Sequence, residues 1–90
     1  MVDLDIEEAT VITVHAKLFA TLRRHYPHLG IGEPMPVRLP AGAKVGDLIE
    51  RLNVPAEQVK IVFVNNVIQG HEHPLAEGDE VGIFPPVGGG

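Results

Sequence analysis

Four short stretches of the chain carry the apolar patterns of β-strands. They are Val11–Phe19, Met35–Leu39, Ile61–Val64 and Glu80–Phe84. Apolar and polar residues alternate in the first, second and fourth stretches, which predicts strands with one buried face. Prolines flank the second stretch and confine it to a sheet edge, because proline cannot donate a ladder hydrogen bond. The third stretch is apolar throughout and predicts a central strand.

One stretch carries the apolar spacing of an amphipathic helix. It runs from Lys44 to Leu52, and its apolar positions are Val45, Leu48, Ile49 and Leu52. Asp47 lies in the predicted first turn, where a negative charge interacts favourably with the helix dipole. The predicted N-cap is imperfect, because Lys44 offers no accepting side chain. A shorter helix is predicted over Ala20–His25, with one leucine facing inward.

The predicted order of elements is strand, strand, helix, strand, short strand, strand. The short strand covers Val67–Gln69 and follows a tight turn at Asn65-Asn66, two residues that tolerate positive φ. If the terminal strands lie side by side and the helix covers one face, every apolar stripe is buried. That is a β-grasp, an α+β fold with a mixed four- to five-stranded sheet. We expect an N-terminal extension over residues 1–10, either loose or an edge strand, a β-grasp domain over 11–84, and a flexible tail over 85–90.

Composition limits the classes of function. Ninety residues with 44% hydrophobic and 21% charged side chains are typical of one folded domain. The net charge of −5 argues against nucleic acid, and it fits either a basic partner surface or simple solubility. No apolar run reaches membrane-spanning length and no signal peptide is evident, which predicts a cytoplasmic protein without membrane association. The chain contains no cysteine, so no disulfide or thiolate site is expected.

The final stretch, Phe84-Pro85-Pro86-Val87-Gly88-Gly89-Gly90, combines three properties. The pair Pro85-Pro86 fixes φ and ends any sheet, so the chain leaves in an extended form. Gly88, Gly89 and Gly90 carry no side chains and can thread a narrow channel. Fully extended, the six residues after Phe84 reach about 20 Å. We interpret this tail as a presented reactive group, the carboxylate of Gly90. The alternative is an ordinary frayed terminus.

Strand parity places Phe19 and Phe84 on the faces opposite the buried residues of their strands. If the first and last strands are neighbours, both rings lie together on the uncovered sheet face beside the tail, and Phe63 can join them. An exposed aromatic cluster on a small domain marks a partner-binding surface. The alternative, in which these rings fold back into the core, stays open at this point.

The titratable residues do not form a recognisable catalytic or metal site. His71 and His73 are two residues apart and could share a strand face. A structural zinc site needs four closely arranged ligands, usually with cysteine among them, and therefore no metal is expected. The adjacent carboxylates Asp79 and Glu80 point to different sides of a strand and do not suit an acid/base pair.

The motifs together resemble the ubiquitin-like sulfur carriers. The matching stretches are V-H-A-K-L-F-A-T-L at Val14–Leu22, V-G-D-L at Val45–Leu48, Val64-Asn65, the turn and strand at Pro74–Val81, and the tail from Phe84. Within this family the chain is most similar to the small subunit of molybdopterin synthase, and the thiamine-pathway sulfur carrier is a near relative. It departs from the family pattern at Lys44, where Thr or Ser commonly opens the helix, and at Asn66, where Gly is common. The N-terminal extension is a further departure.

The resemblance implies a carrier cycle in which this chain binds no cofactor. A partner enzyme of the ubiquitin-activating type would adenylate the Gly90 carboxylate with ATP, and a persulfide sulfur donor would convert it to a thiocarboxylate. The loaded tail would then enter the large subunit of molybdopterin synthase and give its sulfur to a cyclic pterin monophosphate. The resemblance also implies that the face with Phe19, Phe63 and Phe84 docks on the partners.

Three alternatives stay open on the sequence. The first is a carrier of the thiamine or another pathway, with thiazole synthase as the receiving partner in the thiamine case. The second is a ubiquitin-like modifier that forms isopeptide bonds with lysines, and the third is an interaction domain with an inert tail. No independent catalytic site is expected, because the chain lacks even a phosphate-binding G-x-x-x-x-G-K-[ST] loop for the ATP.

Overall fold

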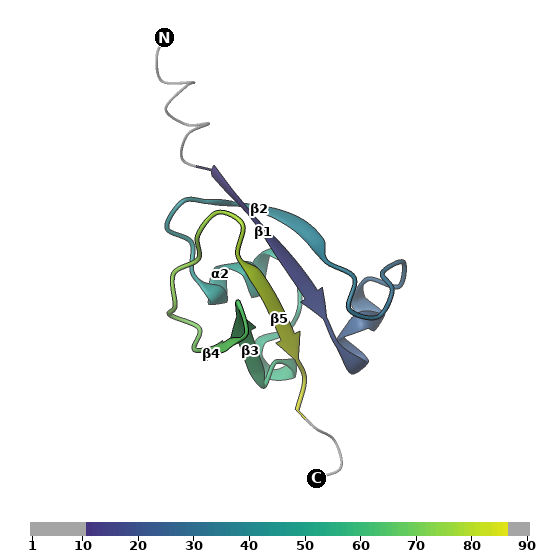
Figure 1. Cartoon of the computed structure of the whole chain (residues 1–90). Helices are drawn as coiled ribbons and strands as arrows, with labels where there is room; N and C mark the ends of the chain where they lie inside the picture. Colours follow the sequence, from purple (N-terminus) through teal and green to yellow (C-terminus); the bar gives the residue numbers. More distant parts are fainter. Residues whose placement is uncertain (1–10, 87–90) are drawn as a thin grey trace.

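The computed structural model describes residues 11–86, which form a five-stranded sheet with a helix against one face (Figure 1). The strands are β1 (Val11–Leu18), β2 (Met35–Pro40), β3 (Ile61–Val64), β4 (Val67–Gln69) and β5 (Glu80–Phe84). The helix α2 covers Val45–Arg51, and the 3₁₀ helices η1 and η2 cover Ala20–His25 and Ala56–Gln58. The predicted extension over 1–10 and residues 87–90 of the predicted tail lie outside the described residues.

The first and last strands lie side by side at the centre of the sheet. The strand order is β2-β1-β5-β3-β4, in which β1 and β5 run parallel and every other neighbouring pair is antiparallel. β2 forms one edge, as its prolines predict, and β4 forms the other. With α2 across one face, this arrangement confirms the predicted β-grasp fold.

The core lies between the sheet and α2 and uses the alternate residues that the strand period selects. Its most deeply buried large side chains are Val14, Leu18, Leu22, Val45, Leu48, Val81 and Ile83. Each strand therefore has a closed face toward the helix and an open face on the other side. In β3, only Val62 and Val64 are buried, although the whole strand is apolar. Ile61 and Phe63 are half-buried, because the open face has no helix over it.

The start and end of α2 show how the sequence compensates for an imperfect cap. Lys44 has no accepting side chain, but its backbone N–H donates to Oδ2 of Asp47 at 2.8 Å. The Asp47 carboxylate therefore satisfies an unpaired donor and also lies near the positive end of the helix. After the last turn, Asn53 has a φ of 61°, a left-handed conformation that is typical of helix ends.

Two turns of the chain, one after β1 and one between β3 and β4, position the ends of these strands. The predicted helix over Ala20–His25 is confirmed as the 3₁₀ helix η1, in which Leu22 is 1% exposed. Ala20 begins it with a φ of 55°, which the sequence did not indicate because alanine rarely adopts this conformation. In the hairpin between β3 and β4, Asn65 and Asn66 have φ values of 51° and 73°, and this confirms the predicted turn.

Replacing a central core residue tests the packing of α2 on the sheet. Leu48 is fully buried, so Leu48→Ala should lower the free energy of unfolding by about 2–5 kcal/mol, measured by urea denaturation. Val67 of β4 is 56% exposed, and Val67→Ala should change that free energy by no more than about 0.5 kcal/mol. Equal effects of the two substitutions would contradict the observed core.

Candidate functional site

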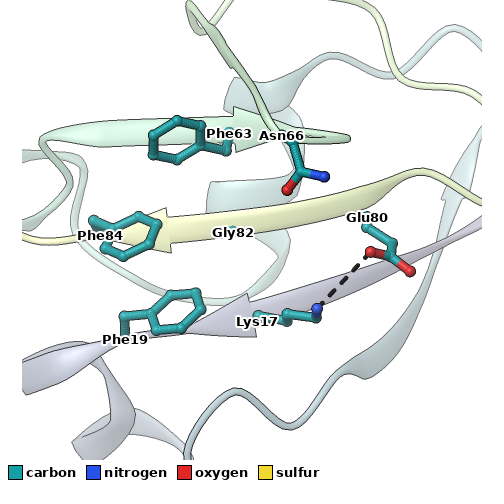
Figure 2. Close-up of a pocket in the computed structure, with 7 residues that line it drawn as sticks. All are labelled: Lys17, Phe19, Phe63, Asn66, Glu80, Gly82 and Phe84. Atoms are coloured by element: carbon teal, nitrogen blue, oxygen red, sulfur yellow. Dashed lines mark ion pairs between the residues drawn. The ribbon is translucent and has the colours of Figure 1, made fainter.

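Three aromatic rings form a row on the open face of the sheet (Figure 2). Phe84 stacks on Phe19, with ring centroids 4.3 Å apart and ring planes within 1° of parallel. Phe63 approaches Phe84 edge to face, with centroids 5.6 Å apart and planes at 78°. All three residues are half-buried, which confirms that they gather on the open face and do not fold back into the core. We call Phe19, Phe63 and Phe84 the aromatic row.

The pairing of β1 with β5 creates the aromatic row. Leu18 pairs with Ile83, and both side chains are buried on the closed face. The residues that follow are Phe19, directly after β1, and Phe84, the last residue of β5, and their side chains therefore lie side by side on the open face. The Phe19 N–H donates to the carbonyl oxygen of Ile83 at 3.2 Å and fixes the end of this ladder. Two rings that are far apart in the sequence are thus held in contact.

A hollow of about 280 Å³ opens beside the aromatic row. Its floor is Gly82, which pairs with Lys17 on one side and with Phe63 on the other. The remaining walls are Phe19, Phe63, Phe84, Lys17, Asn66 and Glu80 (Figure 2). Lys17 Nζ lies 3.8 Å from Glu80 Oε1, and both side chains are partly exposed, so this ion pair adds little to stability. The hollow is therefore aromatic at one end and polar at the other.

The chain leaves the sheet through Pro85 and Pro86, which line a groove between η1 and η2. The other residues that line this groove are Thr21, Arg24, Glu57 and Gln58. Directly before the proline pair, the carbonyl oxygen of Phe84 accepts a hydrogen bond from the Lys60 N–H at 2.8 Å. The ladder cannot continue, because proline has no N–H. Gly88, Gly89 and Gly90 lie outside the described residues, and the role predicted for them stays a prediction.

The carboxylates near the open face have structural partners. Asp79 accepts hydrogen bonds from the Ala76 N–H at 2.8 Å and from Asn65 Nδ2 at 2.9 Å, which stabilise the turn before β5. Glu80 faces Lys17 instead.

Within residues 11–86, no three metal-ligating side chains lie close enough together to hold a metal ion. Over the same range, no helix combines the length and hydropathy needed to cross a membrane. The described open face therefore offers an aromatic surface beside one partly exposed ion pair.

Sequence reasoning missed two residues of the open face, Gly82 and Ile68. Ile68 is 61% exposed and pairs with Phe63, which extends the apolar surface to the β4 edge of the sheet. Its position could have been found from the turn at Asn65-Asn66, because a two-residue turn sets the register of a hairpin. The position of Gly82 could also have been predicted, because it alternates with Glu80 and Phe84 along the last predicted strand and therefore lies on the same face.

A double-mutant cycle tests the contact between the stacked rings. Phe19→Leu and Phe84→Leu should each destabilise the domain, and the double variant should show a coupling of about 0.5–1.5 kcal/mol in chemical denaturation. The control pair is Phe19→Leu and Val67→Ala. Phe19 directly follows β1, and Val67 lies in β4, which two strands separate from β1 in the sheet, so the effects of these two substitutions should add within about 0.5 kcal/mol. Additive effects of the two phenylalanine substitutions would show that the rings do not interact.

Comparison with known proteins relates this surface to a family. The model of the ThiS family matches residues 16–90, a range that contains the aromatic row and the tail. The chain is 56% identical over 30 residues to the molybdopterin synthase sulfur carrier subunit of Escherichia coli (strain K12). That stretch is 33% of this chain and spans only 37% of the length of the Escherichia coli protein.

Two solved archaeal structures are similar over most of their length. A putative molybdopterin converting factor, subunit 1, from Pyrococcus furiosus is 29% identical with a TM-score of 0.65, and the likeness covers 84% of this chain and 99% of that one. The small archaeal modifier protein 1 from Methanosarcina acetivorans is 27% identical with a TM-score of 0.64, over 89% and 98% of the two chains. Because the family model covers most of the sequence, the chain belongs to the ThiS family.

Proposed function

We propose that this chain is a sulfur carrier whose Gly90 carboxylate is converted to a thiocarboxylate. Membership in the ThiS family supports this proposal. The observation that carries it is the position of Phe84, which belongs to the aromatic row and also directly precedes Pro85 and Pro86. A protein that covers the aromatic row therefore also lies where the tail leaves the domain. We assign that position to an adenylating enzyme of the ubiquitin-activating type.

The proposed cycle needs no reacting side chain from this protein. A carboxylate oxygen attacks the α-phosphorus of ATP, and pyrophosphate leaves. The terminal sulfur of a persulfide donor then attacks the acyl carbon, AMP leaves and an acyl disulfide forms, which a second thiol splits to release the thiocarboxylate. The partner binds the ATP, because the sequence contains no phosphate-binding loop of the P-loop type. The sulfur comes from outside, because the chain has no cysteine.

Molybdopterin synthesis is the pathway that we propose for the sulfur. The names of the Escherichia coli relative and of the Pyrococcus furiosus protein both refer to molybdopterin. In this pathway the chain acts as the small subunit of a molybdopterin synthase, and the large subunit receives the loaded tail. The sulfur then passes to a cyclic pterin monophosphate. In a carrier of the thiamine pathway, a thiazole synthase would be the receiving partner instead.

A second candidate function is protein modification. The likeness to the small archaeal modifier protein 1 from Methanosarcina acetivorans favours it. Both functions begin with the same acyl adenylate, and they differ in the nucleophile: a sulfur atom in a carrier and the ε-amine of a target lysine in a modifier. Docking of an adenylating enzyme on the aromatic row would serve both functions and does not distinguish them. The nucleophile must therefore be identified chemically.

Mass spectrometry of the protein isolated from its own cells tests the proposal. A carrier should show an exchange of one oxygen for sulfur that fragmentation locates at Gly90, because the thiocarboxylate is the form that donates. A branched peptide on a target lysine would instead assign the chain to the modifiers. A tail with neither change in cells that make molybdopterin would contradict both functions.

A truncated chain provides the control for this measurement. Removal of Gly89 and Gly90 should abolish sulfur loading, because no activated carboxylate remains at the required position. The thermal unfolding temperature should stay unchanged, since the buried core lies within residues 14–83. A large fall in that temperature would show that the two glycines contribute to folding, and the loss of loading could then not be assigned to chemistry.

A further inference from the structure

Gly82 occupies a position where glycine is unfavourable for the backbone. It lies in the middle of β5, the central strand, and pairs in register with Lys17 of β1 and Phe63 of β3. A glycine inside a strand loses more conformational freedom on folding than other residues and packs no side chain. The φ of Gly82 lies outside the left-handed region, so no turn or unusual conformation requires glycine here. The reason for this glycine must lie in the space above it.

The space above Gly82 is the hollow beside the aromatic row. A Cβ added at this position would lie 3.3 Å from Cε2 of Phe19 and 3.5 Å from Cε1 of Phe84. A side chain at this position would therefore press on both rings and extend into the hollow of about 280 Å³ beside them (Figure 2). Pockets for drug-sized ligands commonly have volumes of about 300–1,000 Å³. The hollow is smaller than this range and fits a single large side chain.

The lining indicates the chemistry of that side chain. The edges and faces of Phe19, Phe63 and Phe84 form one end of the hollow, which favours an apolar or aromatic group. Lys17 and Glu80 form the other end, and their nitrogen and oxygen atoms are 3.8 Å apart in an exposed pair. Such a loose pair can exchange partners at little cost, so polar groups on a docking protein can meet both charges. An apolar anchor with a polar rim fits this lining.

We propose that Gly82 is the specificity-determining position of this docking face and that the hollow receives one bulky apolar side chain of the adenylating partner. The inference rests on the proposed function. The hollow is continuous with the start of the tail, because Phe84 forms part of its wall and Pro85 follows directly. The protein that activates the tail therefore covers the hollow. Buried apolar anchors of this kind dominate the binding energy of protein interfaces.

Filling the hollow tests this assignment. The probe is ATP–pyrophosphate exchange by the ubiquitin-activating-type enzyme of the same organism, measured against the concentration of this protein. Gly82→Val should raise the KM for the protein by about tenfold or more, because the anchor no longer fits. The value of kcat should stay unchanged, because the tail and its carboxylate are intact. The thermal unfolding temperature is measured in parallel, because the valine side chain must displace the Phe19 ring, which lies 3.3 Å from a Cβ at this position.

Two further variants separate docking from folding. Gly82→Ala requires the Phe19 ring to move by only a few tenths of an ångström and should give an intermediate KM, even if the valine variant fails to fold. Gly70→Ala is the matched control, because Gly70 follows β4 and a Cβ there meets nothing within 4 Å. It should leave both KM and the unfolding temperature unchanged.

Three other outcomes would overturn the inference. Wild-type KM values in both Gly82 variants would show that no partner side chain enters the hollow. A wild-type dimer that Gly82→Val dissociates without changing KM would assign the hollow to a second copy of this chain. The absence of any exchange with the wild-type protein would instead remove the proposed function itself, and the inference with it.

Discussion

The parallel pairing of β1 and β5 is the constraint on which the rest of the structure depends. On the closed face, this pairing packs the buried residues of both strands against α2. On the open face, it brings Phe19 and Phe84 into a stack at the ends of the two strands. Because the strands run in the same direction, η1 and the proline pair leave the sheet at the same end. A single pairing thus forms the core, the aromatic row and the exit of the tail.

The two faces of the sheet differ in the residues that they carry and in the role that we assign to each. The closed face buries aliphatic side chains, and among the described residues no polar or charged side chain is buried there. The open face keeps three aromatic rings half-buried and has a glycine in the central strand, where glycine does not favour folding. Departures from local structural preference are expected where a surface has another role. We therefore interpret the open face as the part of the domain that partners recognise, while the proposed reacting group lies at Gly90.

Periodicity predicted the fold well because each strand needs only its period of two to define its faces. The same parity placed Phe19 and Phe84 on the open face, and the hairpin turn followed from the tolerance of asparagine for positive φ. Features that depend on contacts between distant residues were not predictable in this way. The position of Gly82 beneath two ring edges requires the register of three strands, and the left-handed Ala20 follows from the path between β1 and η1. A local detail was missed as well: the cap of α2 by Asp47 uses the backbone N–H of residue 44, which the type of that residue does not reveal.

The chemistry of the tail is the central claim, and the composition of the chain makes it directly measurable. Because the protein has no cysteine, a thiol-selective alkylating reagent has no ordinary side chain to label. The measurement is tandem mass spectrometry of the protein after incubation with its adenylating enzyme, ATP and a persulfide donor, followed by alkylation. Our account predicts one label, located at Gly90 and dependent on ATP. Adenylation of the protein without any label at Gly90 would contradict it.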